Sequence, residues 1–191
     1  DDLPFFMGVM ERLADGGFPA PRPIRTKAGA LHGDLDGKAA AIVTFLTGLS
    51  PRKPTVAQCR ALSAALARMH GLLGDFPIPR ANALSVSGWR PLVDPRLALA
   101  EQLRPGLSAL VSADLADLEG RWPTGLPEGV IHADLFPDNA FMSDAEVLGV
   151  FDFYFACTDA LAYDLAVCLN AWCFEPDRSF NFAKGRAMIT A

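Results

Sequence analysis

The sequence predicts an α+β fold, in which a small sheet-containing lobe precedes a larger and mainly helical lobe. Three observations support this prediction. A helical apolar pattern opens the chain, an Asp-Gly turn signal follows within the first 48 residues, and most later apolar patterns repeat at helical spacing. About half of the 191 residues are apolar, so the chain can bury a substantial core.

The first lobe is predicted over residues 1–48. Its elements are a helix over residues 3–14 and a hairpin made of segments 27–35 and 38–46. The hairpin rests on Asp36-Gly37, a pair typical of two-residue turns. Residues 44–48 then read as a hinge, because a strand-like run ends in Thr-Gly and two prolines follow soon after.

The second lobe is predicted over residues 49–191 and is helical except around one short strand and one hairpin. Helices are expected over residues 55–73, 95–104, 106–121 and 159–174, with a last helix capped by Ser179. The proline-rich stretch 75–95 reads as a loop. A strand over 129–131 and a hairpin of 141–142 and 147–151 complete the pattern.

The segment His132-Ala133-Asp134-Leu135-Phe136-Pro137-Asp138-Asn139, with Phe151-Asp152-Phe153 after it, carries the chemistry. Phosphoryl transfer needs a group that orients the attacking hydroxyl and oxygen ligands for the magnesium ions on nucleotide phosphates. In the pattern H-x-D-x-x-x-x-N the Asp accepts the hydroxyl proton and the Asn binds a metal. These roles fall to Asp134 and Asn139, and Asp152 supplies an anionic metal ligand. In the alternative interpretation, the aspartates serve only in turns and at a strand end.

Departures from a protein kinase indicate the kind of acceptor. Ala133 stands where a protein kinase has the Arg that pairs with a phosphorylated loop, and Phe136 stands where it has a Lys. Phe153-Tyr154 follows Asp152 in place of Phe-Gly, and no A-P-E sequence comes later. These differences favour a small hydroxyl-bearing substrate over a protein.

Composition excludes several other classes. The net charge is −5 and there is no basic cluster, which argues against nucleic-acid binding. No apolar stretch reaches membrane-spanning length without a charge or break. The four cysteines form no C-x-x-C pair and the three histidines are scattered, so no zinc signature is present. Without a signal peptide, the cysteines are expected to be reduced thiols of a cytoplasmic protein.

The loop Val130–Asn139 resembles the catalytic loop of the aminoglycoside-phosphotransferase and choline-kinase superfamily. The stretches Phe151–Cys157, Leu161–Ala166 and Leu169–Glu175 are similar to the bacterial homoserine kinases of that superfamily, and Leu3-Pro4-Phe5-Phe6 and Ser87-Gly88-Trp89 extend the likeness over nearly the whole chain. The resemblance implies a protein-kinase-like two-lobe fold. It also implies phosphorylation of the L-homoserine hydroxyl by ATP with Mg²⁺, in threonine biosynthesis.

By the same resemblance, the chain is a fragment that lacks the N-terminal phosphate loop and the C-terminal end. Asp134 is then the base, Asn139 and Asp152 are the magnesium ligands, and Asp164 supports the catalytic loop. His132 is expected to orient that loop, and His70 to pack in a common helix motif. The hinge maps onto residues 44–48, so that Thr44, Phe45 and Leu46 face the nucleotide. The candidates for substrate contact, for which core packing is equally open, are Tyr154, Asn170 and Trp172.

Two alternatives stay open at this point. One is another small-alcohol kinase of the same fold, acting on choline, an aminoglycoside or methylthioribose. The other is a catalytically inactive nucleotide-binding module, although the intact Asp134, Asn139 and Asp152 argue against it. The sequence contains no signal for oligomeric state.

Overall fold

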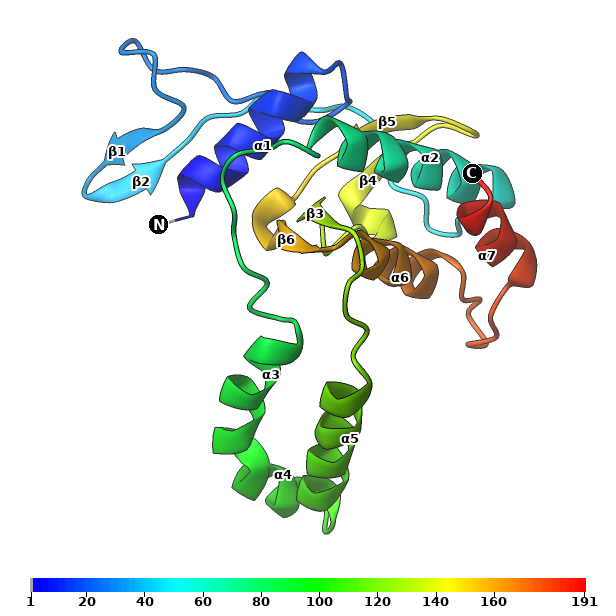
Figure 1. Ribbon diagram of the computed structural model, residues 1–191. Helices are drawn as coiled ribbons and strands as arrows, with labels where there is room; N and C mark the ends of the chain where they lie inside the picture. The colour runs from blue at the N-terminus through cyan, green and yellow to red at the C-terminus, as the bar shows by residue number, and fades with distance from the viewer. Residues whose placement is uncertain (1) are drawn as a thin grey trace. The chain divides into compact units, whose positions relative to one another are not determined.

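The computed structural model describes residues 2–191 and divides into two compact units (Figure 1). The first unit joins the chain up to Arg80 with Pro127–Ala191, and the second consists of Ala81–Leu126. This division differs from the predicted boundary at residue 48, which stays a prediction. Helix α1 and the later helices of the first unit contribute to one buried core, so residues before and after position 48 pack together.

The first unit contains four helices and two 3₁₀ turns around three small sheets. The helices are α1 (Leu3–Asp15), α2 (Val56–Leu72), α6 (Leu161–Trp172) and α7 (Phe182–Ile189), with 3₁₀ turns at Pro137–Asn139 and Phe153–Phe155. The strands are β1 (Gly33–Leu35), β2 (Lys38–Ala40), β3 (Glu128–Ile131), β4 (Ala140–Met142), β5 (Val147–Val150) and β6 (Cys157–Ala160).

Helix α1 forms because apolar residues recur at helical spacing and Pro4 occupies its first turn, where a missing N–H costs nothing. Its buried face includes Phe6, Met7 and Met10. The helix carries Glu11 on its side, where the carboxylate pairs with Arg25 at 2.6 Å. Glu11 is therefore an ion-pair partner within this unit.

Helix α2 begins at a capping box. The Thr55 hydroxyl accepts from the Gln58 backbone N–H at 3.2 Å, and the Gln58 side chain accepts from the Thr55 N–H at 3.0 Å. The Gln58 amide also donates to the Ser143 carbonyl, in the turn between β4 and β5, at 2.9 Å. The cap thus ties the start of α2 to the hairpin that follows the catalytic loop.

Each sheet of the first unit is one antiparallel pair: β1 with β2, β3 with β6, and β4 with β5. The predicted Asp36-Gly37 turn is confirmed, with φ of 54° and 75°, although the hairpin around it is shorter than predicted. Strand β6 corrects the prediction of a helix from residue 159. Its residues pair with β3 from Ile131↔Cys157 to Glu128↔Ala160, and α6 begins only at Leu161.

The second unit is a helical hairpin of α3 (Val86–Val93), α4 (Leu97–Leu103) and α5 (Leu107–Arg121). Helix α3 lies inside the stretch predicted as loop. The prediction was wrong because the stretch was read as a loop from its proline content, whereas Pro91 is accommodated inside this short helix. Arg90 on α3 makes a two-bond ion pair with Glu119 on α5, both bonds at 2.8 Å, and Trp89 packs edge-on against Trp122.

Helix α7 starts two residues later than predicted. Its cap is Asn181, whose side chain accepts from the Lys184 N–H at 3.1 Å, while the predicted cap Ser179 instead bonds to Asp177. Across residues 2–191, no helix combines the length and the apolar character that crossing a membrane requires.

Candidate active site

The catalytic loop begins where β3 ends in the core. Ile131 and His132 are fully buried, and the next residue, Ala133, has a left-handed backbone with φ of 63°. This turn directs the chain toward the surface, so that Asp134 is partly exposed. A non-glycine residue in this conformation is strained and needs support from its surroundings.

That support comes from Asp164 on α6. Its carboxylate is fully buried and accepts the His132 backbone N–H at 2.8 Å and the Ala133 N–H at 3.0 Å. A third bond, at 3.0 Å, joins Asp164 to the ring of His70 on α2. A buried carboxylate that is satisfied in this way fixes the backbone just before Asp134.

The His132 ring joins the catalytic loop to the predicted metal loop, Phe151–Phe153. Nδ1 accepts the Asp134 backbone N–H at 3.3 Å, and Nε2 lies 3.0 Å from the Phe151 carbonyl. A carbonyl only accepts, so Nε2 carries the proton and the imidazole is neutral. Burial lowers the pKa of His132, against the opposing effect of the nearby Asp164 carboxylate.

This buried neutral imidazole predicts a loss of stability in mild acid. Below pH about 6.5 the unfolded chain protonates His132 whereas the native state does not, so the free energy of unfolding falls as pH falls. The slope contributed is at most about 1.4 kcal/mol per pH unit. Urea unfolding at pH 7, 6 and 5 should show a shallower pH dependence for His132→Gln than for wild type. Identical slopes would contradict this assignment.

Asn139 and Asp152 are brought together by the β4–β5 hairpin. Ala140 pairs with Val150, and the Phe151 N–H donates to the Asn139 carbonyl at 3.1 Å, so Asp152 lies one residue beyond the partner of Asn139. Asp152 is exposed and has φ of 63°. The Asn139 amide donates to the Asp134 carboxylate at 3.0 Å and to the Asp134 carbonyl at 2.8 Å.

Electrostatic interactions and a hydrogen bond also link Asp134 to its neighbours. Burial raises the pKa of the Asp134 carboxyl, while His132 and the Asn139 hydrogen bond lower it, and the negative charge of Asp152 raises it again. Asp152 is therefore near enough to act on Asp134 through space. The amide nitrogen of Asn139 is committed to Asp134, which leaves its oxygen as the free donor atom for a cation.

The predicted hinge lies along the β4–β5 hairpin. The Met142 N–H donates to the Leu49 carbonyl at 3.0 Å, and a side chain at Gly48 would lie 2.5 Å from the Phe141 Cβ, so only glycine fits. Thr44 is bonded to Arg22 through both its N–H and its hydroxyl. In the described chain, Phe45 and Leu46 make no backbone hydrogen bond.

The three candidates for substrate contact lie in different surroundings. Tyr154 is 59% exposed beside Asp152, with its ring edge-on to Phe6. Trp172 lies in the core, which is the other position that the sequence left open. Asn170 is exposed, but it is two residues from the buried positions 168 and 172 and so projects from the opposite face of α6.

His70 has a role that sequence reasoning missed. It was expected to be a packing residue, but its ring bonds to Asp164 and so belongs to the network under the catalytic loop. The two residues are 94 positions apart. No local pattern relates them, so only the packing of α2 against α6 reveals the pair.

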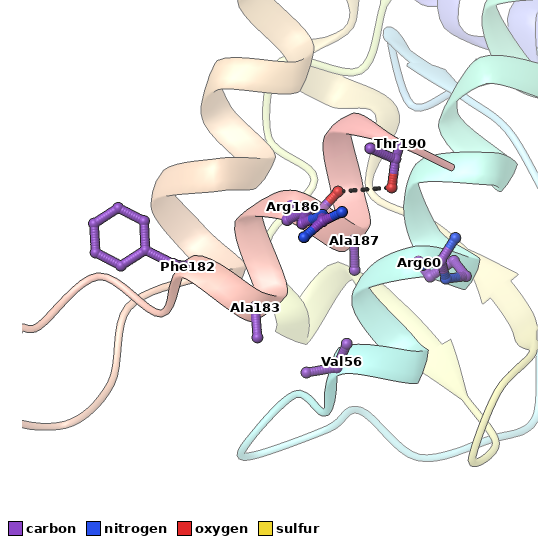
Figure 2. A pocket seen from close by; sticks show the side chains of 7 residues that line it. All are labelled: Val56, Arg60, Phe182, Ala183, Arg186, Ala187 and Thr190. Atoms are coloured by element: carbon purple, nitrogen blue, oxygen red, sulfur yellow. Dashed lines mark hydrogen bonds between the residues drawn. The ribbon is translucent and has the colours of Figure 1, made fainter.

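Two cavities of the first unit differ in their relation to these residues. A small one of about 150 Å³ includes Asp152 and Tyr154 in its wall, together with apolar residues of α1 and Val43. A wider one of about 600 Å³ lies between α2 and α7, and none of the predicted site residues lines it (Figure 2). The site is therefore defined by the two loops and not by the larger hollow.

The catalytic loop and the adjacent hairpin bring together the carboxylates of Asp134 and Asp152 and the amide of Asn139. Phosphoryl transfer uses groups of these kinds. The fold is of the predicted protein-kinase-like α+β class. The model of the phosphotransferase enzyme family matches residues 1–188, and the chain belongs to that family.

The relatives and solved structures agree with this membership. The chain is 59% identical to the homoserine kinase of Methylobacterium nodulans and 55% identical to that of Xanthobacter autotrophicus, in each case over the whole chain but only 59% of the relative. It therefore spans about three fifths of the curated relatives. An aminoglycoside-3'-phosphotransferase of type VIII is 26% identical with a TM-score of 0.66, over 96% of this chain and 70% of that one.

A more distant neighbour shows the fold alone. The amicoumacin kinase hAmiN, solved in complex with AMP-PNP, Ca²⁺ and Ami, has a TM-score of 0.71 at 14% identity, over 98% of this chain and 60% of its own. The predicted protein-kinase-like fold class is thus confirmed.

Proposed function

We propose that the complete protein is an ATP-dependent homoserine kinase, which phosphorylates the L-homoserine hydroxyl to O-phospho-L-homoserine in threonine biosynthesis. The observation that carries this proposal is the identity of 55–59% to homoserine kinases along the entire chain, including both loops of the site. The four free cysteines, all buried, support a cytoplasmic location, where thiols stay reduced.

Asp134 is the residue that receives the substrate hydroxyl. Its carboxylate is partly exposed, its backbone is fixed by Asp164 and His132, and one of its oxygens is held by Asn139. In a loose transition state the hydroxyl proton leaves late, so the contribution of Asp134 is mainly to orient the attacking oxygen and then to accept the proton. A raised pKa makes the carboxylate a better acceptor for that proton.

The residues present fit a magnesium ion by their chemistry. Asp152 offers an exposed carboxylate and Asn139 a free amide oxygen, and hard oxygen atoms are the ligands that Mg²⁺ prefers. When bound, the ion would offset the charge of the nucleotide phosphates. The left-handed backbone of Asp152 turns the chain at the end of β5, and the His132 ring fixes the preceding carbonyl.

The nucleotide base is proposed to lie against the hinge. Phe45 and Leu46 supply backbone N–H and C=O groups without other partners in residues 2–191, whereas the N–H of Thr44 is already used. Adenine presents both an acceptor and a donor, so such a free segment suits it. Tyr154, beside Asp152, is the remaining candidate for contact with the amino-acid acceptor.

Turnover by the complete protein tests the proposal. With ATP and Mg²⁺, a coupled assay is expected to show ADP formation that depends on L-homoserine, with O-phospho-L-homoserine found by mass spectrometry. Choline, an aminoglycoside and methylthioribose are the control acceptors, and each should give less than a hundredth of the kcat/KM. Preferential turnover of a control acceptor would reassign the substrate. Nucleotide binding without any turnover would indicate an inactive module.

A further inference from the structure

Helix α6 has three buried residues, Asp164, Cys168 and Trp172, and they are spaced four apart. Residues at this spacing lie on one face of a helix, and the three span about 12 Å along its axis. All three bond to the catalytic loop. The buried face of α6 therefore follows the loop along its length.

The two ends of this face bind opposite sides of Asp134. Before it, Asp164 accepts the N–H groups of His132 and Ala133. After it, the Trp172 indole N–H donates to the Leu135 carbonyl at 2.8 Å. Asp134 thus sits between two backbone positions that are both anchored to α6.

At the Leu135 carbonyl, the hydrogen bond from Trp172 is stronger than the one from Cys168. The Cys168 sulfur is 3.8 Å from the same carbonyl, and burial raises the pKa of this thiol, which stays a weak S–H donor. Leu135, Cys168 and Trp172 are all essentially inaccessible to solvent. A buried carbonyl needs a donor, and the indole supplies it.

We propose that Trp172 is a positioning residue for phosphoryl transfer. By fixing the Leu135 carbonyl it sets the orientation of the peptide unit between Leu135 and Phe136, one residue beyond Asp134, and so restrains the backbone that carries the Asp134 carboxylate. Asp164 does the same for the preceding peptide groups. The inference rests on the proposed function for its kinetic test, and on the contacts of α6 for its structural test.

Two substitutions separate the hydrogen bond from simple packing. Trp172→Phe keeps an aromatic ring of intermediate size but has no N–H. Trp172→His is smaller, yet its Nε2–H occupies the ring position of the indole N–H. If the bond positions the loop, the His variant retains more activity than the Phe variant. If only packing matters, the order is reversed, since Phe fills more of the space.

Activity is measured in the complete protein at pH 8, where the introduced imidazole is mostly neutral. Trp172→Phe is expected to lower kcat about ten- to a hundredfold, because small misplacements of a catalytic group cost rates of this order. The KM values for ATP and homoserine should change less than about twofold. Trp172→His should recover at least part of the lost kcat.

Ser63→Ala is the matched control. Ser63 on α2 donates to the Met188 carbonyl at 2.7 Å, which is also a buried bond from a side chain to a backbone carbonyl in the first unit. Within residues 2–191, no side-chain hydrogen bond joins Ser63 to either loop of the site. This variant should lose stability while keeping kcat. A folded Trp172→Phe protein with kcat within twofold of wild type would overturn the proposal. So would a Trp172→Phe protein that fails to fold while Ser63→Ala folds.

Hydrogen exchange supplies a readout that does not depend on the substrate. In Trp172→Phe the peptide covering residues 131–137 should exchange faster than in wild type, while the α2 peptide is unchanged. If wild type shows this protection but does not phosphorylate homoserine, the proposed function fails and the positioning role of Trp172 stands. Unchanged exchange of the loop would reject the positioning role whatever the substrate.

Discussion

Asp134→Ala is expected to reduce kcat for phosphoryl transfer by about 10²–10⁴-fold, which corresponds to roughly 3–5 kcal/mol of transition-state stabilisation. The reason is geometric: this carboxylate is the acidic group that both flanking backbone anchors and the Asn139 amide hold in place. Calorimetry with ATP and Mg²⁺ should give a Kd within about threefold of wild type, because orienting the acceptor is separate from holding the nucleotide.

Asp138→Ala is the matched control for this result. Asp138 lies in the same loop, carries the same side chain and is exposed. Its loss should change kcat less than about threefold, as is usual for a surface substitution. Near-normal turnover by Asp134→Ala would remove the assigned role, and an equal loss in both variants would point to general disruption of the loop.

The second large effect is expected at Asp152. Asp152→Ala should remove most of the Mg²⁺ dependence of nucleotide binding, since the chain loses the one negatively charged ligand proposed for the ion. The measurement is a calorimetric titration of the protein with ATP, once in about 5 mM MgCl₂ and once in EDTA. Wild type should bind at least tenfold more tightly with the metal, and the variant about equally in both.

Asp144→Ala, in the turn of the same hairpin, serves as its control because Asp144 is exposed and belongs to neither loop of the site. It should keep the magnesium dependence of wild type. If Asp152→Ala keeps that dependence as well, the metal is bound by other residues. The two experiments at positions 134 and 152 thus separate transfer from nucleotide binding.

The sequence predicts those parts of the fold whose signals are local. The start of α2 near Thr55, the Asp36-Gly37 turn and the apolar face of α1 each depend on residues within or next to the element that they define. Strand β6 was missed for the opposite reason. Its four residues form a strand only because β3, more than twenty-five positions earlier, offers its edge.

The candidate site divides in the same way. Asp134, Asn139 and Asp152 could be proposed from the sequence because the chemistry constrains residue type and spacing within one short stretch. The supporting roles of His70 and Trp172 could not be predicted in this way. His70 and Trp172 reach the network through bonds to Asp164 and Leu135, which are 94 and 37 positions away, and an isolated histidine or tryptophan gives no sign of such a partner.

The left-handed backbone at Ala133 narrows which residues can be inherited at that position. Glycine, asparagine and small unbranched residues tolerate the conformation, whereas valine, isoleucine and threonine do so only at a high energetic cost. In a library randomised at codon 133, the active variants would therefore be those whose residue tolerates the left-handed backbone. Selection at this position would act on conformation and not on chemical reactivity. An inactive allele at this codon is evidence about chain geometry and not about a lost chemical group.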